Sequence, residues 1–432
     1  MRRIIPILLS VSLVFCLQFS VSNSAQAQDT VRMTLDSCLR YAYEHNLTVR
    51  TAVLGHESAE VNLRGAKLRF LPTISASASQ GWDWSSTGGS GSNTQYGING
   101  SLPLFNGLAN LRNLQHSKVS SQQSKMRVRQ AENSIGVQIV KAYLTIMMNN
   151  ERLAFQQEVL KTSRQQQLEG ELKYNVGRIL ESDYMLLAAN YTSAQSDIDN
   201  TCITISDNIS TLNDLLYNTG DTLITIMPMD DTLRAASRTI PDFDSVMAQT
   251  MRTMPDWQIS EMGVKLAEIN VDMARSAFIP SVSLNAGYGG GWLPAITEPS
   301  SSFSDNSHMT LGVNIPILNS GSSYTQLKQS KIALQEAELQ HQQDLIDIAS
   351  MIEDVYIALR QALNRFRASE ALMEAYKASY DIYVIKYAEG AVTTVELLQQ
   401  QDRYLSALND YLQSKYSYIL AEKQLDIFTG KM

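Results

Sequence analysis

Apolar residues recur every three or four positions over long stretches of this chain. In the clearest run, from residue 345 to 387, steps of three and four alternate for six heptads and only Ser369 is polar. The run consists of Leu345, Ile348, Ile352, Val355, Leu359, Ala362, Phe366, Ser369, Met373, Tyr376, Tyr380, Tyr383 and Tyr387. This spacing predicts a coiled-coil seam. A weaker seam lies between Ile135 and Leu160. The remaining faces are polar, which favours a helical wall with solvent on both sides.

The same periodicity predicts six helices. They span residues 34–70, 108–173, 178–219, 242–278, 322–386 and 391–428. The two longest, 108–173 and 322–386, contain no proline, and each would be roughly 100 Å long at ~1.5 Å per residue. The other four are about half as long, so two placed end to end would match one long helix. The linker 220–241 is therefore expected halfway along the long axis.

Between the short and long helices the apolar period changes to two. This alternation predicts strands at 73–85, 96–105, 281–292 and 309–318, joined by exposed loops at 86–95 and 293–308. Strands of about ten residues, apolar on one face and with Trp or Tyr near their ends, are typical of membrane-spanning barrels. The alternative is a pair of hairpins in a soluble α+β protein. Four matched strands beside such long helices favour the membrane interpretation.

Four strands are too few to close a barrel, and open sheet edges are not tolerated in lipid. The chain is therefore expected to assemble. Two copies would give eight strands with a lumen filled by side chains, whereas three copies would give twelve strands and an aqueous lumen.

The chain also resembles itself. Residues 102–107 match 315–320, and residues 174–177 match 387–390, both at an offset of 213, while residues 70–72 match 278–280 at an offset of 208. These matches predict a tandem repeat, with a first unit at 28–219 and a second at 242–432.

Residues 1–27 have the pattern of a signal peptide. Arg2 and Arg3 precede an apolar stretch that ends in an Ala25-Gln26-Ala27 cleavage site. The protein is therefore expected to be exported. Cys16 lies within this leader after the bulky Phe15, so we expect no lipid anchor. Without the leader, 33 basic residues face 43 acidic ones, a net charge of −10, so nucleic acid is not an expected partner.

The sequence offers little catalytic chemistry. Cys38 and Cys202 are predicted to be buried, unpaired thiols rather than a disulfide. The segment from His56 to Glu60 lacks the second histidine of a zinc-protease helix, and a group of methionines between residues 227 and 273 is better explained by packing than by copper binding. No phosphate loop, nucleophile elbow or CxxC pair occurs. We therefore expect no enzyme activity, no cofactor and no metal.

The paired marks of the two repeats resemble the TolC-like outer membrane factor family of Gram-negative bacteria. They are the prolines Pro72 and Pro280 between helix and strand, the strand-to-helix segments that contain Pro103 and Pro316, and the two helix turns. The resemblance implies a homotrimer with a 12-stranded barrel in the outer membrane, contacting lipid, and an α-helical tunnel that crosses the periplasm. It also implies a passive exit duct for a tripartite efflux pump or a type I secretion system. The partners would then be a periplasmic adaptor and an inner-membrane transporter.

The candidate site residues lie at the helix-to-helix turns. Gly177 and Gly390 supply the freedom for chain reversal, and an acid follows each after six residues, Asp183 and Glu396. If both acids face the lumen, three copies give a ring of six carboxylates. The resemblance assigns them to closing the entrance or selecting cations. The alternative is two solvated acids at helix starts.

Two tyrosines and one arginine complete the predicted gate. Tyr174 and Tyr387 are interpreted as gate residues or as the last seam positions, and Tyr387 matches the gating tyrosine of the family. Arg178 follows the first glycine, whereas Val392 stands where the best-known member has an arginine. A closing salt bridge would have to be arranged differently here.

A competing hypothesis for the whole chain is a barrel-anchored coiled-coil scaffold or adhesin without transport.

Overall fold

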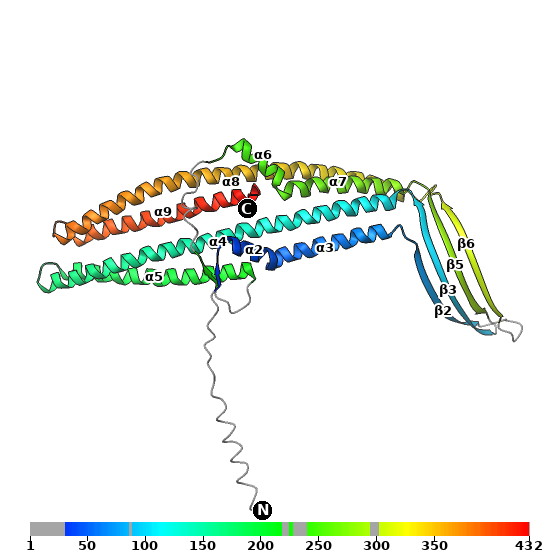
Figure 1. The fold of residues 1–432 in the computed structure, drawn as a ribbon, viewed down its shortest axis with the longest axis horizontal. Helices are drawn as coiled ribbons and strands as arrows, with labels where there is room; N and C mark the ends of the chain where they lie inside the picture. The colour runs from blue at the N-terminus through cyan, green and yellow to red at the C-terminus, as the bar shows by residue number, and fades with distance from the viewer. Residues whose placement is uncertain (1–30, 86–88, 218–223, 228–239, 294–301, 432) are drawn as a thin grey trace, which may run out of the picture.

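A long bundle of helices leads into a four-stranded sheet at one end (Figure 1). The computed structural model describes residues 31–85, 89–217, 224–227, 240–293 and 302–431. The predicted signal peptide lies outside these residues. The helices are α2 (Leu35–His45), α3 (Leu47–Leu68), α4 (Ala109–Asn175), α5 (Glu181–Leu216), α6 (Phe243–Thr253), α7 (Pro255–Ser276), α8 (Ser322–Ala388) and α9 (Thr394–Phe428).

The helices form a curved layer in which α4 and α8 run the whole length. Beside the sheet, neighbours pack in the order α3, α4, α7, α8 (Figure 1). Towards the opposite end the order is α5, α4, α9, α8, since α4 contacts α5 and α9 there and α8 contacts α9. Each long helix has 67 residues, or roughly 100 Å at ~1.5 Å per residue.

The boundaries recur at the offsets seen in the sequence. Helices α2 and α6 each have 11 residues and α3 and α7 each have 22, with starts 208 positions apart. The starts of α4 and α8 are 213 positions apart. Both halves of the chain therefore build the same sequence of elements.

The predictions of single helices at 34–70 and 242–278 were wrong, because each is divided in two. The breaks lie at Asn46 and Met254, again 208 positions apart. Asn46 leaves the helical conformation and caps α3: its side chain accepts from Thr48 N at 2.8 Å and donates to Leu215 O at 2.7 Å. Met254 precedes Pro255, and a residue before proline disfavours helical geometry.

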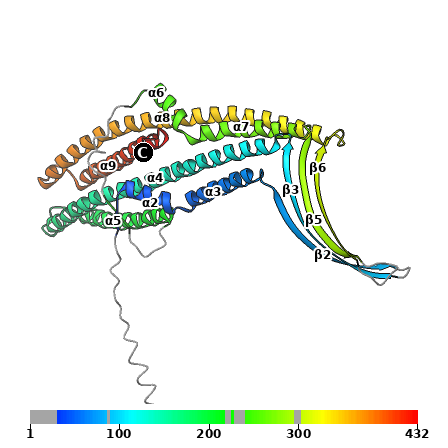
Figure 2. The same cartoon turned by 45° about the vertical axis from the view of Figure 1, so that its right-hand side comes forward.

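The sheet has the order β2–β3–β5–β6 with antiparallel pairing throughout. Its strands are β2 (Thr73–Ser85), β3 (Gly89–Asn106), β5 (Ser281–Leu293) and β6 (Ser302–Asn314). Figure 2 shows the sheet bending as it leaves the helices.

Two predicted strands had the wrong limits. The strand predicted at 96–105 begins at Gly89, and the strand predicted at 309–318 spans 302–314, so both predicted loops were too long. The Gly-, Ser- and Asn-rich ends have low strand propensity, but pairing with a neighbouring strand overrides it. Pro316 lacks an N–H, and β6 stops two residues before it.

A short parallel pair escaped the sequence analysis altogether. Strand β1 (Val31–Met33) pairs with β4 (Ile224–Ile226). Next to β4, the Tyr143 hydroxyl in the middle of α4 donates to Met227 O at 2.6 Å. This part of the linker 220–241 therefore lies beside the midpoint of the long helix, while its residues 228–239 lie outside the described range.

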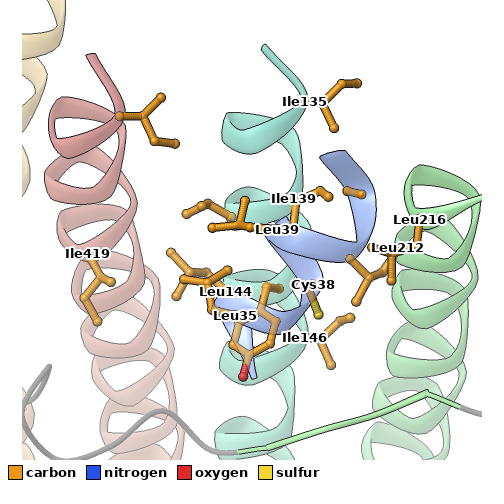
Figure 3. Packing of buried hydrophobic residues seen from close by; sticks show 14 of the residues in the cluster. Leu35, Cys38, Leu39, Ile135, Ile139, Leu144, Ile146, Leu212, Leu216 and Ile419 are labelled. Atoms are coloured by element: carbon orange, nitrogen blue, oxygen red, sulfur yellow. The ribbon is translucent and has the colours of Figure 1, made fainter. Parts of the chain in front are cut away.

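The largest apolar core lies at this midpoint, where α2, α4, α5 and α9 meet (Figure 3). Cys38 is fully buried in it, and burial raises the pKa of its thiol to about 11. Cys202 is exposed, so the prediction that both thiols are buried was wrong for Cys202. Thr201 lies on the buried face of α5, and the next residue is turned by about 100° away from it. Both thiols are free.

The predicted seam of α8 packs against α6 and α9. Its buried positions are Ile348, Ile352, Val355, Leu359, Phe366, Ser369, Tyr380 and Tyr387. Leu363 is also buried, whereas the predicted seam position Ala362 is only partly buried. The polar Ser369 is satisfied because its Oγ lies 2.5 Å from Ser414 Oγ on α9. Among the described residues, no helix is long and apolar enough to cross a membrane.

Candidate functional site at the helical tip and the sheet

The two hairpins of the bundle end in turns with the same backbone geometry. Gly177 has φ +72° and Gly390 has φ +77°, a left-handed conformation that favours glycine. The residue after each glycine bonds back to the helix: Arg178 N donates to Lys173 O, and Ala391 N to Lys386 O, both at 2.8 Å. This is a glycine C-cap used twice. It brings both turns to the end of the bundle farthest from the sheet (Figure 1).

The end of α4 is attached to the end of α8 through Tyr387. This side chain is buried, and Lys173 Nζ lies 4.3 Å from the centroid of its ring. Lys173 also donates to the Tyr387 carbonyl at 3.4 Å. Among the described residues the buried Tyr387 hydroxyl has no hydrogen-bond partner. The cation–π contact joins the two repeats at the tip.

The equivalent Tyr174 has different surroundings. Its ring is exposed and stacks on Tyr184 of α5, with centroids 5.7 Å apart and planes 7° apart. Tyr174 therefore stays within its own hairpin, whereas Tyr387 contacts the other one.

The two predicted acids also differ. Glu396 closes a capping box at the start of α9: its Oε2 accepts from Thr393 N at 2.8 Å and from Thr393 Oγ1 at 2.9 Å. The Thr393 backbone N–H, and then its hydroxyl, hold the pKa of this exposed carboxyl below its usual range. Asp183 occupies the same place in α5, but the N-cap residue there is Leu180 and no side-chain capping bond forms.

The structure brings the predicted residues to one end but not into one cluster. Arg178 is exposed, and within the described part of the chain neither it, Asp183 nor Glu396 takes part in an ion pair. Sequence reasoning missed Lys173, which contacts Tyr387 in the other repeat, 214 positions later in the chain.

A buried polar cluster above the tip was also missed. Asn190 of α5 donates to Ser163 Oγ of α4 at 3.2 Å and to Gln401 Oε1 of α9 at 3.3 Å. Gln401 is only 2% exposed and donates to Ser163 Oγ at 3.4 Å. A glutamine among the apolar heptad positions of α9 was the available signal. These bonds hold three helices in register.

The sheet at the opposite end has two chemically distinct faces, since cross-strand partners share a face. One face carries Ile74, Ala76, Ala78, Trp82, Trp84, Tyr96, Ile98, Leu102, Val282, Leu284, Ala286, Tyr288, Trp292, Phe303, Met309, Leu311 and Val313. Many of these side chains are exposed, such as Ile74 at 72% and Met309 at 75%. The other face carries almost only Ser, Thr, Asn, Gln and Gly. An exposed apolar face of this size marks a contact with lipid or with another protein.

Aromatic rings gather towards the outer end of the apolar face. Phe303 packs on Tyr96 and on Trp292, with ring centroids 6.2 and 5.5 Å apart. Tyr288 OH donates to Asp305 Oδ2 at 3.3 Å. Amphipathic rings in such a band are typical of a membrane–water boundary.

The four prolines lie where helices and strands meet, in unequal positions. Pro72 and Pro280 directly precede β2 and β5. Pro103 lies inside β3, where the register with β5 shifts between Pro103 and Phe105, whereas Pro316 follows the end of β6. A bulge accommodates a residue that cannot donate to the ladder.

Comparison with known proteins shows to which family a chain with this helical bundle and four-stranded sheet belongs. The family model described as "Outer membrane efflux protein" matches residues 38–199 and 248–431. The chain belongs to the outer membrane efflux protein family. Its two matched segments follow the two repeats and leave out the whole linker 220–241.

The relatives of this efflux protein match over most of their length. The outer membrane efflux protein BepC of Brucella suis biovar 1 is 22% identical over 412 residues, which cover 94% of this chain and 87% of BepC. The cation efflux system protein CusC of Escherichia coli O157:H7 is 23% identical over 391 residues, covering 87% and 81%. A crystal structure of CusC has the same fold, with a TM-score of 0.79, 18% identity and 91% of both chains covered.

Membership places this efflux protein in the outer membrane of a Gram-negative bacterium, extending into the periplasm. The family is one of efflux proteins rather than enzymes. It supports the transport hypothesis and not the scaffold or adhesin hypothesis.

Proposed function

We propose that three copies of the chain close into a passive duct, gated at its helical tip, that carries compounds across the periplasm and the outer membrane. The observation that carries this proposal is that both the sheet and the helical layer of the protomer have edges without a packing or pairing partner. In the sheet, β2 pairs only with β3 and β6 only with β5 within the described residues. Backbone groups at such edges must be paired in lipid.

The helical layer has matching edges. Four apolar residues on α3 follow each other in steps of seven, and all are exposed: Leu47, Leu54, Val61 and Leu68. Three more on α8 have the same spacing and are also exposed: Ile332, Leu339 and Ile346. A step of seven returns to almost the same side of a helix. Each edge helix therefore carries an uncovered apolar stripe.

Inside the protomer, the repeat-equivalent helices of α3 and α8 are α7 and α4, and there the corresponding positions are covered. At the repeat offsets, Val61 corresponds to Ile269 on α7, and Ile332 corresponds to Val119 on α4. Helices α4 and α7 pack together, and both Ile269 and Val119 are only 8% exposed. We infer that α8 of one copy packs against α3 of the next as α4 packs against α7.

This contact joins two different surfaces, so it propagates from copy to copy and closes as a ring. Three copies supply twelve strands, enough for an aqueous lumen lined by the polar face of the sheet. The contact of Lys173 with Tyr387 would then hold the tip closed, with Asp183 and Glu396 near the entrance. Tyr174 and Arg178 would complete the gate, and Gly177 and Gly390 would shape its turns.

A duct without an energy source needs partners. Family members work with other components of efflux pumps, and we propose a periplasmic adaptor and an inner-membrane transporter, in a tripartite efflux pump or a type I secretion system. Purification of the tagged protein from crosslinked cells is expected to recover both partners. Deletion is expected to sensitise cells to detergents or dyes.

The assembly is tested by charging one stripe. Leu54→Glu with Val61→Glu places carboxylates at the proposed contact and is expected to abolish trimers in detergent, as measured by light scattering. Val176→Glu, at an equally exposed turn position outside both stripes, is the matched control and is expected to remain trimeric. A trimeric double variant with native far-UV circular dichroism would refute the proposed interface.

A further inference from the structure

A single histidine stands on the polar face of the sheet. His308 lies in the middle of β6, paired with Gly287 of β5, which is in turn paired with Asn99 of β3. Cross-strand partners share a face, so these three residues form one row across the sheet. His308 is exposed.

The imidazole lies over the backbone of β5. A Cβ added to Gly287 would come within 2.5 Å of His308 Cε1, 3.0 Å of His308 Nε2 and 2.7 Å of Asn99 Oδ1. The missing side chain of Gly287 therefore makes room for the ring and for the Asn99 amide. Any other residue at 287 would push the ring away from the sheet.

No other titratable side chain described by the structure shares this face. The face carries Thr73, Ser75, Ser77, Ser79, Gly81, Asn93, Gln95, Gly97, Asn99, Ser101, Ser283, Asn285, Gly287, Gly289, Gly291, Ser304, Asn306, Thr310, Gly312 and Asn314. By register Asp83 belongs to the same face, eight positions beyond Ser75 on β2, or roughly 26 Å along the strand.

The nearest charged residues of the sheet do not reach this row. Asp305 of β6 pairs with Gly290 on the apolar face, where it accepts from Tyr288 OH. On the polar face, the neighbours of His308 along β6 are Asn306 and Thr310, and those of Gly287 along β5 are Asn285 and Gly289. The charge of this row therefore depends on His308 itself.

We infer that His308 determines the ion selectivity of the barrel lumen. This rests on the proposed closed barrel of three copies, in which the polar face lines the lumen and His308 recurs three times at one level. Histidine changes charge between about pH 5 and 8. When its three imidazoles are protonated, the row carries three positive charges, which repel cations and attract anions.

The test uses purified trimers of the full chain in planar bilayers under a KCl gradient. In the wild type, the permeability ratio of K⁺ to Cl⁻ is expected to fall about twofold between pH 8 and pH 5.5. The expected fall is no larger because salt screens each charge within about 10 Å. His308→Gln is expected to remove this fall. His308→Lys, which stays cationic, is expected to show the low ratio at both pH values.

His341→Gln is the matched control. His341 lies in the contact of α8 with α7, with its Nδ1 3.0 Å from Ser260 Oγ and its ring against Trp257, so this variant is expected to keep the wild-type shift. An unchanged shift in His308→Gln, or no shift in the wild type, would overturn the inference while leaving the duct intact. Absence of any conductance both in wild-type trimers and in trimers of Lys173→Met, whose tip is expected to open more often, would overturn the closed barrel and this inference together.

Discussion

The two tip turns share a backbone and differ in almost every side-chain role. In the second repeat, Tyr387 is buried beneath Lys173 and Glu396 is held in a capping box. In the first, Tyr174 stacks on Tyr184 of its own hairpin and Asp183 makes no capping bond. Duplication thus preserved the turn geometry. The contact of Lys173 with Tyr387 links the two hairpins, whereas the equivalent Lys386 and Tyr174 each contact a ring of their own hairpin.

The packing just above the turns differs in the same way. In the first hairpin, Gly170 of α4 leaves room for the buried Leu187 of α5. At the equivalent positions, 213 residues later, the second hairpin has Tyr383 and Gln400. The long helix thus has a glycine in the first hairpin and a tyrosine in the second, so each hairpin fills its interior by a different route.

The largest expected effect comes from forcing the first hairpin to pack like the second. A Cβ at Gly170 would lie 2.5 Å from Leu187 Cδ1, so a tyrosine has no room there. We expect Gly170→Tyr to destabilise the protein by about 3 kcal/mol. Guanidinium unfolding measures this loss, and hydrogen exchange should localise it to the start of α5.

Gly170→Ala is the matched control for this change. It requires only the end of a flexible leucine to shift, and alanine favours a helix over glycine by about 1 kcal/mol. Its stability is therefore expected to equal or exceed that of the wild type. A Gly170→Tyr variant as stable as the wild type would show that the two hairpins tolerate the same packing.

The elements that were predictable from sequence are those with a strong local period. The seam of α8 and the alternation in β2 determine which residues lie together, whatever the rest of the chain does. The breaks at Asn46 and Met254 were readable in principle from capping and proline chemistry, but a long apolar period outweighed them. The early start of β3 at Gly89 was not readable, because it depends on pairing with β2.

The candidate site was predictable in position but not in contacts. Glycines and acids at equal offsets locate both turns and both helix starts. The contact of Lys173 with Tyr387 joins two repeats, and no local pattern encodes it. The capping role of Glu396 was readable, since Thr393 precedes it by three residues. The equivalent residue in the first repeat is Leu180, which cannot cap a helix, so treating Asp183 and Glu396 as equivalent acids overlooked this difference.

The next largest effect is expected from removing the contact between the repeats. Lys173→Met retains most of the aliphatic side chain but loses the charge over the Tyr387 ring, a contact of about 1 kcal/mol at a half-exposed site. If this contact holds the tip closed, the open-to-closed ratio should rise about fivefold, as measured by single-channel recording.

Lys386→Met provides the comparison from the second repeat. Lys386 is equivalent to Lys173 but lies over Tyr383 of its own helix, with Nζ 5.6 Å from the ring centroid. Within the described part of the chain no contact joins it to the other hairpin, so the open probability should stay at the wild-type value. Equal responses of the two lysine variants would contradict the proposal that the contact of Lys173 with Tyr387 holds the tip closed.

A smaller effect is expected from neutralising the two acids. Asp183→Asn with Glu396→Gln removes the charge, while glutamine still closes a capping box. In the proposed trimer, six carboxylates near the entrance would attract cations, so the K⁺-to-Cl⁻ permeability ratio should fall about twofold in the double variant. Glu396→Ala alone also loses the two bonds that the carboxylate accepts from Thr393. Comparing it with the double variant separates the effect of charge from that of helix stability. An unchanged ratio in the double variant would exclude the acids from the gate.

The smallest effect is a pH dependence confined to the second turn. Folding holds the pKa of Glu396 below the ordinary value of 4.5, chiefly through the Thr393 N–H. The ionised cap therefore stabilises α9 fully above pH 4.5, and this stabilisation is lost as the pH falls through the lower pKa of the folded state. Amide exchange at the start of α9 should accelerate in that window. The start of α5, which has no side-chain cap, should change less. Thr393→Ala removes one of the two bonds and should move the transition towards pH 4.5; equal responses of the two helix starts would show that the capping box does not distinguish the repeats.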